Sequence, residues 1–292
     1  MKLVQLVAFL GISFSCALGY AQTRVAYPAP ENANDVRYSD LIEILKTALD
    51  KTSPQYGPYT AAPTSVLMNE ARQLAVIEQS NTIINVVWSS TSEEKEQKLL
   101  PIRIPLRKGI LGYRIALTSK SKQAEIDKVT TLDDLKKLTV GQGLGWGDVE
   151  IYKTNGITVF SAQYDSLFKM AAGGRFDLFP RGISEIGPEF EANSADLPEL
   201  AIEKGLLIYY PWPYYFFFNA QDKALAKRVE TGIRMMIQDG SFNTIFKKYN
   251  ANAIEKANFK GRRVIRIENA MLPKATPLND KNLWFDPTRD LK

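Results

Sequence analysis

The chain has 292 residues, of which 45% are hydrophobic and 24% charged, a balance typical of a globular protein with room for two lobes. Its formal net charge is +5, and it contains no histidine and one cysteine, Cys16. This composition excludes Ser-His-Asp and Cys-His nucleophilic catalysis, and also zinc sites of the usual His or Cys type. We therefore expect neither a metal site nor a cofactor.

The N-terminus has the pattern of a secretory signal. Lys2 precedes an apolar run from Leu3 to Leu18, and small residues follow at Gly19 and Ala21. The run is short for a membrane span. We predict that residues 1–21 are a removed signal peptide and that the protein is periplasmic. The alternative is a lipoprotein anchored through Cys16, which the bulky Phe14 and the lack of a leucine three residues before the cysteine disfavour.

Downstream of the signal, strand and helix patterns alternate. The first half predicts strands or extended segments at 23–27, 58–62, 82–88, 102–106 and 110–118, and helices at 35–49, 65–78 and 91–100. From Thr131 the pattern restarts, with helices from 131 and 148 and at 165–172, 184–193, 221–238 and 242–249, and strands near 139–140, 157–160 and 176–180. An extended run at 206–218 is broken by Pro211 and Pro213. This alternation predicts an α/β fold.

Two successive α/β units, with a long extended segment on each side of the second, predict one lobe inserted into another. We expect residues 22–110 and 212–292 to form the first lobe and residues 111–211 the second. The chain would then cross between the lobes at two hinge crossovers, near 107–119 and near 206–218. The segment 250–292 is expected to wrap onto the first lobe, with Trp284 as its anchor.

The order of these elements resembles the periplasmic solute-binding proteins of ABC transporters, in the amino-acid-binding family of type II topology. The matching segments are Asn85–Lys95, Gly112–Thr118, Thr131–Lys136, Gly173–Asp177 and Asp239–Phe242. The resemblance implies two lobes that close over a small-molecule solute without catalysis. It also implies a monomer that works with an inner-membrane ABC permease or a membrane sensor, and no nucleic-acid partner.

The chain departs from this family at two ligand-binding positions. A threonine and an arginine three residues later hold the ligand carboxylate in the family, and Ser92 and Lys95 match them here, which replaces a bidentate fork with a point charge. The aspartate that holds the α-ammonium falls at about Gly182, next to Arg181. We hypothesise that the solute is polar or anionic and is not gripped as the family grips an α-amino acid.

Two local patterns point to ligand contacts in the second lobe. The glycine-rich turn at 141–147 would direct free backbone N–H groups at an anionic group, with Asp148 as the N-cap of the following helix. The strand at 176–180 would deliver Arg181 at its carboxyl end, where α/β sheets bind ligands. The predicted ligand-binding residues are Tyr27, Trp88, Ser90, Ser92, Lys95, Arg114, Trp146, Asp148 and Arg181.

Each of these predictions has a structural alternative. Tyr27 and Trp88 fit a hydrophobic core as well as a ligand wall, and Arg181 could pair with Glu185 instead of with a ligand. At the level of function, the alternative to a binding protein is an enzyme on the same scaffold, such as a lyase resembling cyclohexadienyl dehydratase. Asp148, Asp177 or Glu185 would then be its general acid.

Overall fold

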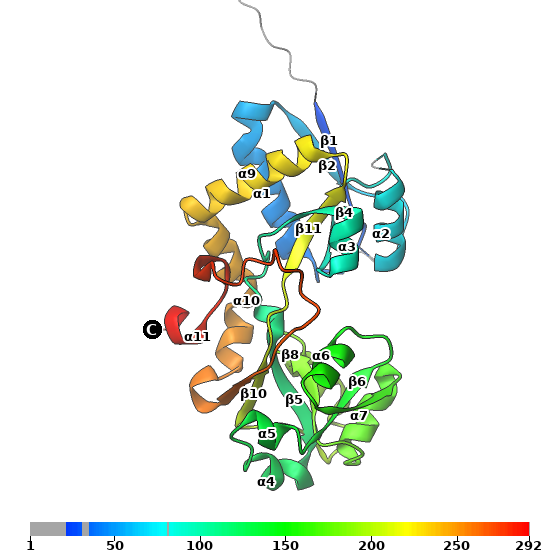
Figure 1. Ribbon diagram of the computed structural model, residues 1–292, viewed down its shortest axis with the longest axis vertical. Coiled ribbons are helices and arrows are strands. Elements are labelled where there is room, and N and C mark those ends of the chain that lie inside the picture. The colour runs from blue at the N-terminus through cyan, green and yellow to red at the C-terminus, as the bar shows by residue number, and fades with distance from the viewer. Residues whose placement is uncertain (1–21, 31–34, 81, 292) are drawn as a thin grey trace, which may run out of the picture.

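The computed structural model describes residues 22–30, 35–80 and 82–291 and shows two lobes, one above the other in Figure 1. The expected signal peptide, residues 1–21, lies outside the described residues. Within those residues, no helix combines the length and the apolar character needed to cross a membrane. We call the upper lobe of Figure 1 the first lobe and the lower one the second lobe, and the alternation of strands and helices in both confirms the expected α/β class.

The first lobe has two small sheets. A parallel pair joins β1 to β2, and in the other sheet β11 lies between β3 and β4 and runs antiparallel to both. Helices α1 and α9 pack together over a core that includes Leu45, Val229 and Phe216. The elements are β1 (Thr23–Tyr27), α1 (Ser39–Tyr56), β2 (Tyr59–Pro63), α2 (Glu70–Gln79), β3 (Val87–Ser90), α3 (Glu93–Lys98), β4 (Leu99–Ile102), β11 (Tyr214–Asn219) and α9 (Lys223–Gln238).

The second lobe is built on a sheet of order β12-β10-β5-β8, in which β9 also pairs with β5, and on the parallel pair β6-β7. The strands are β5 (Tyr113–Ser119), β6 (Thr139–Gly143), β7 (Thr158–Ala162), β8 (Phe179–Gly182), β9 (Leu200–Ile202), β10 (Leu206–Tyr209) and β12 (Arg263–Arg266). The helices are η1 (Ile110–Gly112), η2 (Lys120–Lys122), α4 (Gln123–Ile126), α5 (Leu132–Leu135), α6 (Asp148–Thr154), α7 (Tyr164–Ala172) and α8 (Ile186–Asn193).

The two expected crossovers lie side by side. The first runs from the end of β4 to β5, and the second joins β10 to β11 through residues 210–213, where Pro211 and Pro213 break the extended run as expected. The Tyr210 N–H donates to the Gly112 carbonyl at 3.2 Å. A Cβ atom on residue 112 would lie 1.9 Å from the Tyr210 carbonyl oxygen, so only glycine permits this close approach.

The C-terminal segment contacts both lobes. Its elements are α10 (Ser241–Lys256), η3 (Phe259–Gly261), β12, η4 (Lys281–Leu283) and α11 (Pro287–Asp290). The strand β12 runs parallel to β10 in the second-lobe sheet, although the expected division gave residues 212–292 to the first lobe. Trp284 then returns to the first-lobe core with 7% of its surface exposed, as expected of an anchor.

Several predicted local features differ in the structure. The N-cap of α6 is Gly147 and not Asp148, which is the first helical residue and is used in an ion pair. Ser92 caps α3 by accepting from the Lys95 N–H at 3.2 Å. The apolar segment at 82–88 becomes a strand only from Val87, and it pairs antiparallel with β11 and not in a parallel sheet. Arg181 lies within β8 (Phe179–Gly182), where it is paired with Ile115 of β5, and not beyond the strand's end.

Candidate functional site

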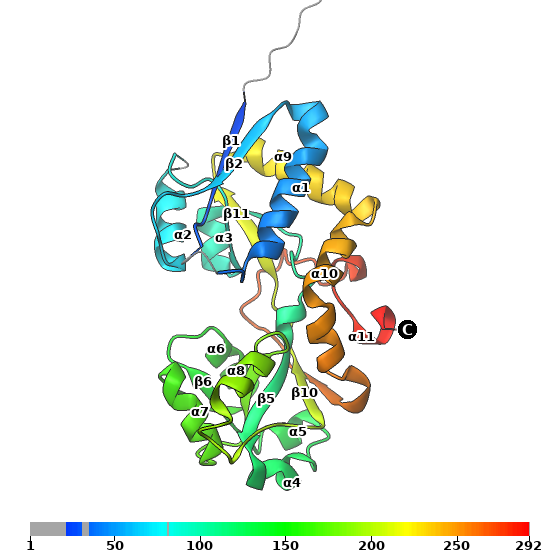
Figure 2. The same cartoon turned by 180° about the vertical axis from the view of Figure 1, so that it is seen from behind.

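Helices α6 and α8 lie at the end of the second lobe that is nearer to the first lobe (Figure 2). Asp148 is the first residue of α6, and Glu185 is the N-cap of α8. Arg114 on β5 and Arg181 on β8 come from adjacent strands, because Arg114 is in register with Gly182 and Ile115 with Arg181. Both arginine residues are only 7% exposed. Buried guanidinium groups need acidic partners. The structure supplies three, and we call Arg114, Asp148, Arg181, Glu185 and Glu189 the charge cluster.

Arg114 is held mainly by the start of α6. Its Nη2 lies 2.9 Å from Asp148 Oδ1, and its Nη1 lies 3.6 Å from Glu185 Oε2. The Tyr210 hydroxyl also donates to Asp148, and the guanidinium lies 5.4 Å from the Tyr210 ring centre. Burial is the largest influence on the Arg114 pKa and lowers it, but Asp148, Tyr210 and Glu185 together outweigh burial and raise the guanidinium pKa. Its buried Nε has no hydrogen-bond partner among the described residues.

The guanidinium of Arg181 is held by two carboxylates, those of Glu189 on α8 and of Glu185, the N-cap of that helix. Its Nε and Nη2 each donate to Glu189 at 2.6 Å, and its Nη2 lies 3.3 Å from Glu185 Oε2. The guanidinium also stacks 4.7 Å from the Trp146 ring centre. The structural alternative to a ligand contact is therefore present for Arg181, with Glu189 as the main partner. A solute anion would have to compete with a bidentate carboxylate.

Glu185 is the exposed member of the charge cluster. Its Oε2 accepts from the Gly182 N–H at 2.8 Å and faces both arginine residues, and its Oε1 has no partner among the described residues. Burial is the largest influence on its pKa and raises it, but Arg181, Arg114 and the Gly182 N–H outweigh burial and hold the pKa below its ordinary value. The side chain is nevertheless 40% exposed.

The carboxylate of Glu185 fills the space in front of Gly182. A Cβ atom on residue 182 would lie 3.0 Å from Glu185 Oε2. This is the position at which the family resemblance places a ligand-binding aspartate. The negative charge is therefore present there, delivered by a residue three positions later in the chain. The charge cluster as a whole has three carboxylates against two guanidinium groups, and Glu185 exposes the excess charge.

The first lobe contains a second group of residues, in which aromatic rings surround one ion pair between Arg107 and Asp40. Arg107 donates to both Asp40 oxygens at 2.6 and 2.8 Å, and its guanidinium lies 5.8 Å from the ring centres of Tyr38 and Tyr214. The Trp88 ring packs 5.4 Å from that of Tyr38. We call Tyr38, Asp40, Trp88, Arg107 and Tyr214 the aromatic cluster. The charge of Arg107 also contributes to the lowered pKa of Glu185, so the two clusters interact between the lobes.

The predicted carboxylate-binding residues lie at the end of β3 and the start of α3. The Lys95 ammonium donates to Ser89 Oγ at 2.6 Å and to the Ser90 carbonyl at 2.9 Å, and it lies 3.4 Å from Glu70 Oε1. Its side chain is 25% exposed. Glu70 therefore already neutralises part of the charge of the Lys95 ammonium. Ser92 uses its hydroxyl to cap the helix.

Tyr27 and Trp88 are 5% and 3% exposed and belong to the first-lobe core, so the core alternative describes most of their surface. The predicted set omitted Arg107 and Glu189, and named Glu185 only as a pairing partner or acid. The spacing of Arg181, Glu185 and Glu189 would have indicated one helical face next to a strand end. No comparable signal links Arg107 to Asp40, which lie 67 positions apart.

Comparison with solved structures confirms the fold. YckB of Bacillus subtilis aligns with a TM-score of 0.51 at 15% identity, covering 84% of this chain and 96% of that one. A Salmonella typhimurium periplasmic binding protein with high arginine specificity aligns at 0.48 and 14%, covering 78% and 99%. An ancestral amino-acid-binding protein, a precursor of cyclohexadienyl dehydratase, aligns at 0.45 and 15%, covering 78% and 95%. No protein-family model and no curated protein matches the sequence.

Proposed function

We propose that this chain, which has the two-lobed α/β fold of type II periplasmic binding proteins, is an exported solute-binding protein without catalytic activity. It captures a small polar solute between the charge cluster and the aromatic cluster. It then presents the solute to a membrane permease of the ABC type or to a membrane sensor. The fold supports this function, since such folds hold ligands between their lobes, but the choice of solute rests on the residues of this chain.

The observation that carries the proposal is the exposed carboxylate of Glu185. Its lowered pKa keeps it ionised at neutral pH, its side chain is 40% exposed, and its Oε1 accepts no hydrogen bond from the described residues. Its neighbours Arg114 and Arg181 already have carboxylate partners. A charge-assisted hydrogen bond to an ammonium or guanidinium group satisfies this site better than an anion does. We therefore assign the solute a cationic group and give up the anionic branch of the sequence hypothesis.

The aromatic cluster supplies the opposite wall. Tyr38, Trp88 and Tyr214 offer ring surface and Arg107 stays paired to Asp40, so this side suits the uncharged part of the solute. Ser90, Ser92 and Lys95 lie at the end of the strand that carries Trp88, and they would meet a polar group of the solute. On the second lobe, Trp146 would contact the solute beside Arg181.

The enzyme alternative requires a general acid that is protonated near neutral pH. The pKa values of both Asp177 and Glu185 are lowered: burial raises each, but Lys122 and Thr139 outweigh it at Asp177, and Arg181 and Arg114 at Glu185. Asp148 accepts from the Tyr210 hydroxyl and pairs with Arg114. Asp177 and Glu185 are thus held as carboxylates by their ion pairs, and Asp148 is engaged by Arg114 and Tyr210, which favours binding over proton transfer.

The test begins with native mass spectrometry of the protein purified from its host, followed by denaturation and identification of any released compound. A thermal-shift panel of amines, amino acids, neutral sugars and dicarboxylates follows, with the compounds re-analysed afterwards. We expect stabilisation by compounds with a cationic group and their unchanged recovery. Stabilisation by dicarboxylates alone would overturn the assignment of the solute, and conversion of a compound would overturn the absence of catalysis.

Export is tested separately. N-terminal sequencing of the protein recovered from the host's extracytoplasmic fraction should begin at Gln22. A chain that retains residues 1–21 in the cytoplasm would contradict the proposed location. A lipid attached at Cys16 would favour the lipoprotein alternative.

A further inference from the structure

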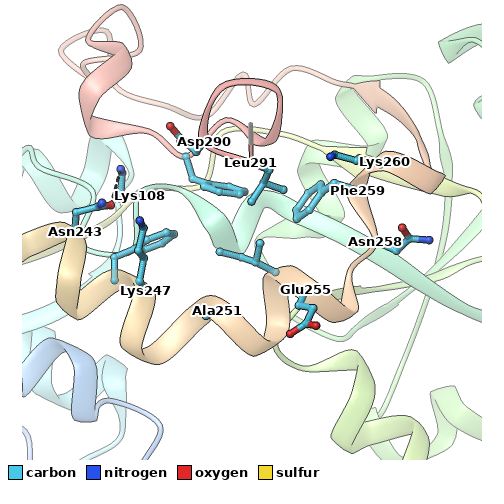
Figure 3. A pocket seen from close by; sticks show the side chains of 13 residues that line it. Lys108, Asn243, Lys247, Ala251, Glu255, Asn258, Phe259, Lys260, Asp290 and Leu291 are labelled. Atoms are coloured by element: carbon cyan, nitrogen blue, oxygen red, sulfur yellow. Dashed lines mark hydrogen bonds between the residues drawn. The ribbon is translucent and has the colours of Figure 1, made fainter.

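A cavity lies between α10 and the C-terminal segment that ends in α11 (Figure 3), and no member of the charge cluster or the aromatic cluster lines it. Its volume is about 630 Å³, which falls in the range of small-molecule sites. None of the predicted ligand-binding residues lines it. The binding function proposed above therefore does not account for this cavity.

The middle of the cavity is apolar and firmly built. Phe246, Phe259 and Phe285 are between 4% and 7% exposed. The ring of Phe285 lies 5.8 Å from that of Phe246 and 5.7 Å from that of Phe259, so one ring joins the helix to the segment after it. Ile254 and Leu291 complete the apolar lining. Such a surface suits a hydrocarbon chain or an aromatic body.

One end of the cavity holds two ammonium groups, those of Lys108 and Lys247 (Figure 3). Neither has an ion-pair partner within 4 Å among residues 22–30, 35–80 and 82–291. The only polar contact of the Lys108 ammonium there is Asn243 Oδ1 at 3.5 Å, and the group lies 5.4 Å from the Phe246 ring centre. The nearby acid Asp290 already accepts from Arg289 at 2.8 and 2.9 Å.

The backbone holds Lys108 in an unfavourable conformation. Its φ of 49° lies in the left-handed region, which side chains other than glycine seldom adopt. Its carbonyl oxygen accepts from the Phe285 N–H at 2.8 Å, so the C-terminal segment fixes this turn. Burial is the main cause that lowers the pKa of Lys108; Arg289 and Lys247 add to this effect, and Asp290 opposes it. Strain of this kind persists where the surroundings impose it, and it is common at ligand sites.

We propose that this cavity binds an amphiphilic organic anion, with its apolar body between the three phenylalanine rings and its single anionic head group at Lys108 and Lys247. An anion would supply the partner that both ammonium groups lack, and the ring surfaces would desolvate its body. The residues involved lie outside the interlobe site, so the proposal does not rest on the function proposed above.

The test uses decanoate as the probe, titrated into the full chain by isothermal calorimetry below its micelle concentration. Decanol and decyltrimethylammonium have the same chain with a neutral and a cationic head. We expect one saturable decanoate site per chain, weaker binding of decanol, and none of the cation. Equal binding of all three compounds, or no saturable decanoate binding, would overturn the proposal.

Two variants locate the site. Ala251→Trp places a ring from the exposed face of α10 into the cavity and should abolish decanoate binding, whereas Thr244→Trp on the same helix lies outside the lining and should not. Lys108→Met should weaken decanoate roughly tenfold, as expected for a charged hydrogen bond, and leave decanol unchanged. Its control is Lys256→Met. If Lys108→Met fails to fold by circular dichroism, Lys247→Met replaces it. Unchanged decanoate binding in Ala251→Trp would contradict the assigned location.

Discussion

The charge cluster of the second lobe and the aromatic cluster of the first lobe neutralise buried arginine residues in different ways. Each buries guanidinium groups near the gap between the lobes. In the aromatic cluster, one arginine meets one carboxylate, and rings surround the pair. In the charge cluster, two arginine residues meet three carboxylates, and Glu185 exposes the excess. The formal charges of the aromatic cluster therefore cancel, whereas the charge cluster has one excess negative charge that a solute could neutralise.

The largest effect is expected where the charge cluster loses Arg114, the partner of Asp148. Arg114→Met leaves Asp148, with its side chain 11% exposed, without its ion-pair partner. Removing one member of a buried pair costs about 3–5 kcal/mol. Urea unfolding followed by fluorescence measures the loss. The control is Arg234→Met, whose side chain is 59% exposed and whose partner Glu230 is 29% exposed, and which should cost less than about 1 kcal/mol. Equal losses of unfolding free energy in the two variants would contradict the claim that the buried pair of Arg114 and Asp148 stabilises the second lobe.

A carboxylate elsewhere in the second lobe shows what pairing without an excess charge does. Asp177 accepts from Lys122 at 2.8 Å and from the Thr139 N–H and Oγ1 at 2.8 and 2.7 Å. Burial raises its pKa, but these bonds outweigh burial and lower it from 3.8. Asp177 therefore stabilises the fold above pH 3.8, and this contribution is lost as the pH falls through the lowered value.

Asp177→Asn should consequently lower the free energy of unfolding by about 1.5–3 kcal/mol at neutral pH, as for hydrogen bonds to a charged group. The difference from the parent protein should shrink as the pH drops below that carboxyl's ordinary pKa. Urea titrations across the acid range measure it. A difference that is constant or grows towards acid pH would show that the carboxylate charge is not responsible.

Within the aromatic cluster, Arg107→Met should cost less than Arg114→Met. The side chain of Arg114 is 8% exposed and pairs with two carboxylates, Asp148 and Glu185, whereas that of Arg107 is 15% exposed and pairs with Asp40 alone. We expect a loss of roughly 1–3 kcal/mol, since one carboxylate loses its partner instead of two. The same urea titration measures it. A loss as large as that of Arg114→Met would remove the proposed difference between the two walls.

The smallest effect is expected at the end of β3. Lys95→Met removes an ammonium that Glu70 and Ser89 already engage. It should change the affinity for a cationic solute by less than about threefold, because a partly exposed pair contributes little. Competition binding against the identified solute measures the change. A loss of two orders of magnitude would show that Lys95, as the family resemblance implies, holds an anionic group of the solute.

The local hydrophobic periodicity of the sequence predicted most of the fold. The features that it did not predict are contacts between residues far apart in the chain. The alternation of helices and strands and the paired prolines at 211 and 213 located both crossovers. The contact of Tyr210 with Gly112, the return of β12 to the second lobe, and the pair of Arg107 with Asp40 each join positions far apart in the chain. Periodicity does not encode such pairs.

The sequence also predicted part of the grouping of the candidate site residues, whereas their role in binding stays a prediction. The sequence singled out Arg114, Asp148, Trp146 and Arg181, and the structure brings them together. The sequence also suggested that the negative charge of the family's aspartate is missing at Gly182, because a match by spacing compares single positions only. The structure places the Glu185 carboxylate against that glycine. The charge was displaced along the chain and not lost.

The most direct measurement compares solute affinity in Glu185→Gln and in Glu191→Gln, an exposed position on the same helix that lies outside the charge cluster. Glu185→Gln should weaken binding of the cationic solute roughly 10- to 100-fold, which corresponds to a charged hydrogen bond of about 1.5–3 kcal/mol, while Glu191→Gln leaves it unchanged. The parent affinity should stay constant between neutral pH and pH 5, since the carboxyl remains ionised there. Undiminished affinity in Glu185→Gln would contradict the claim that this carboxylate recognises the solute.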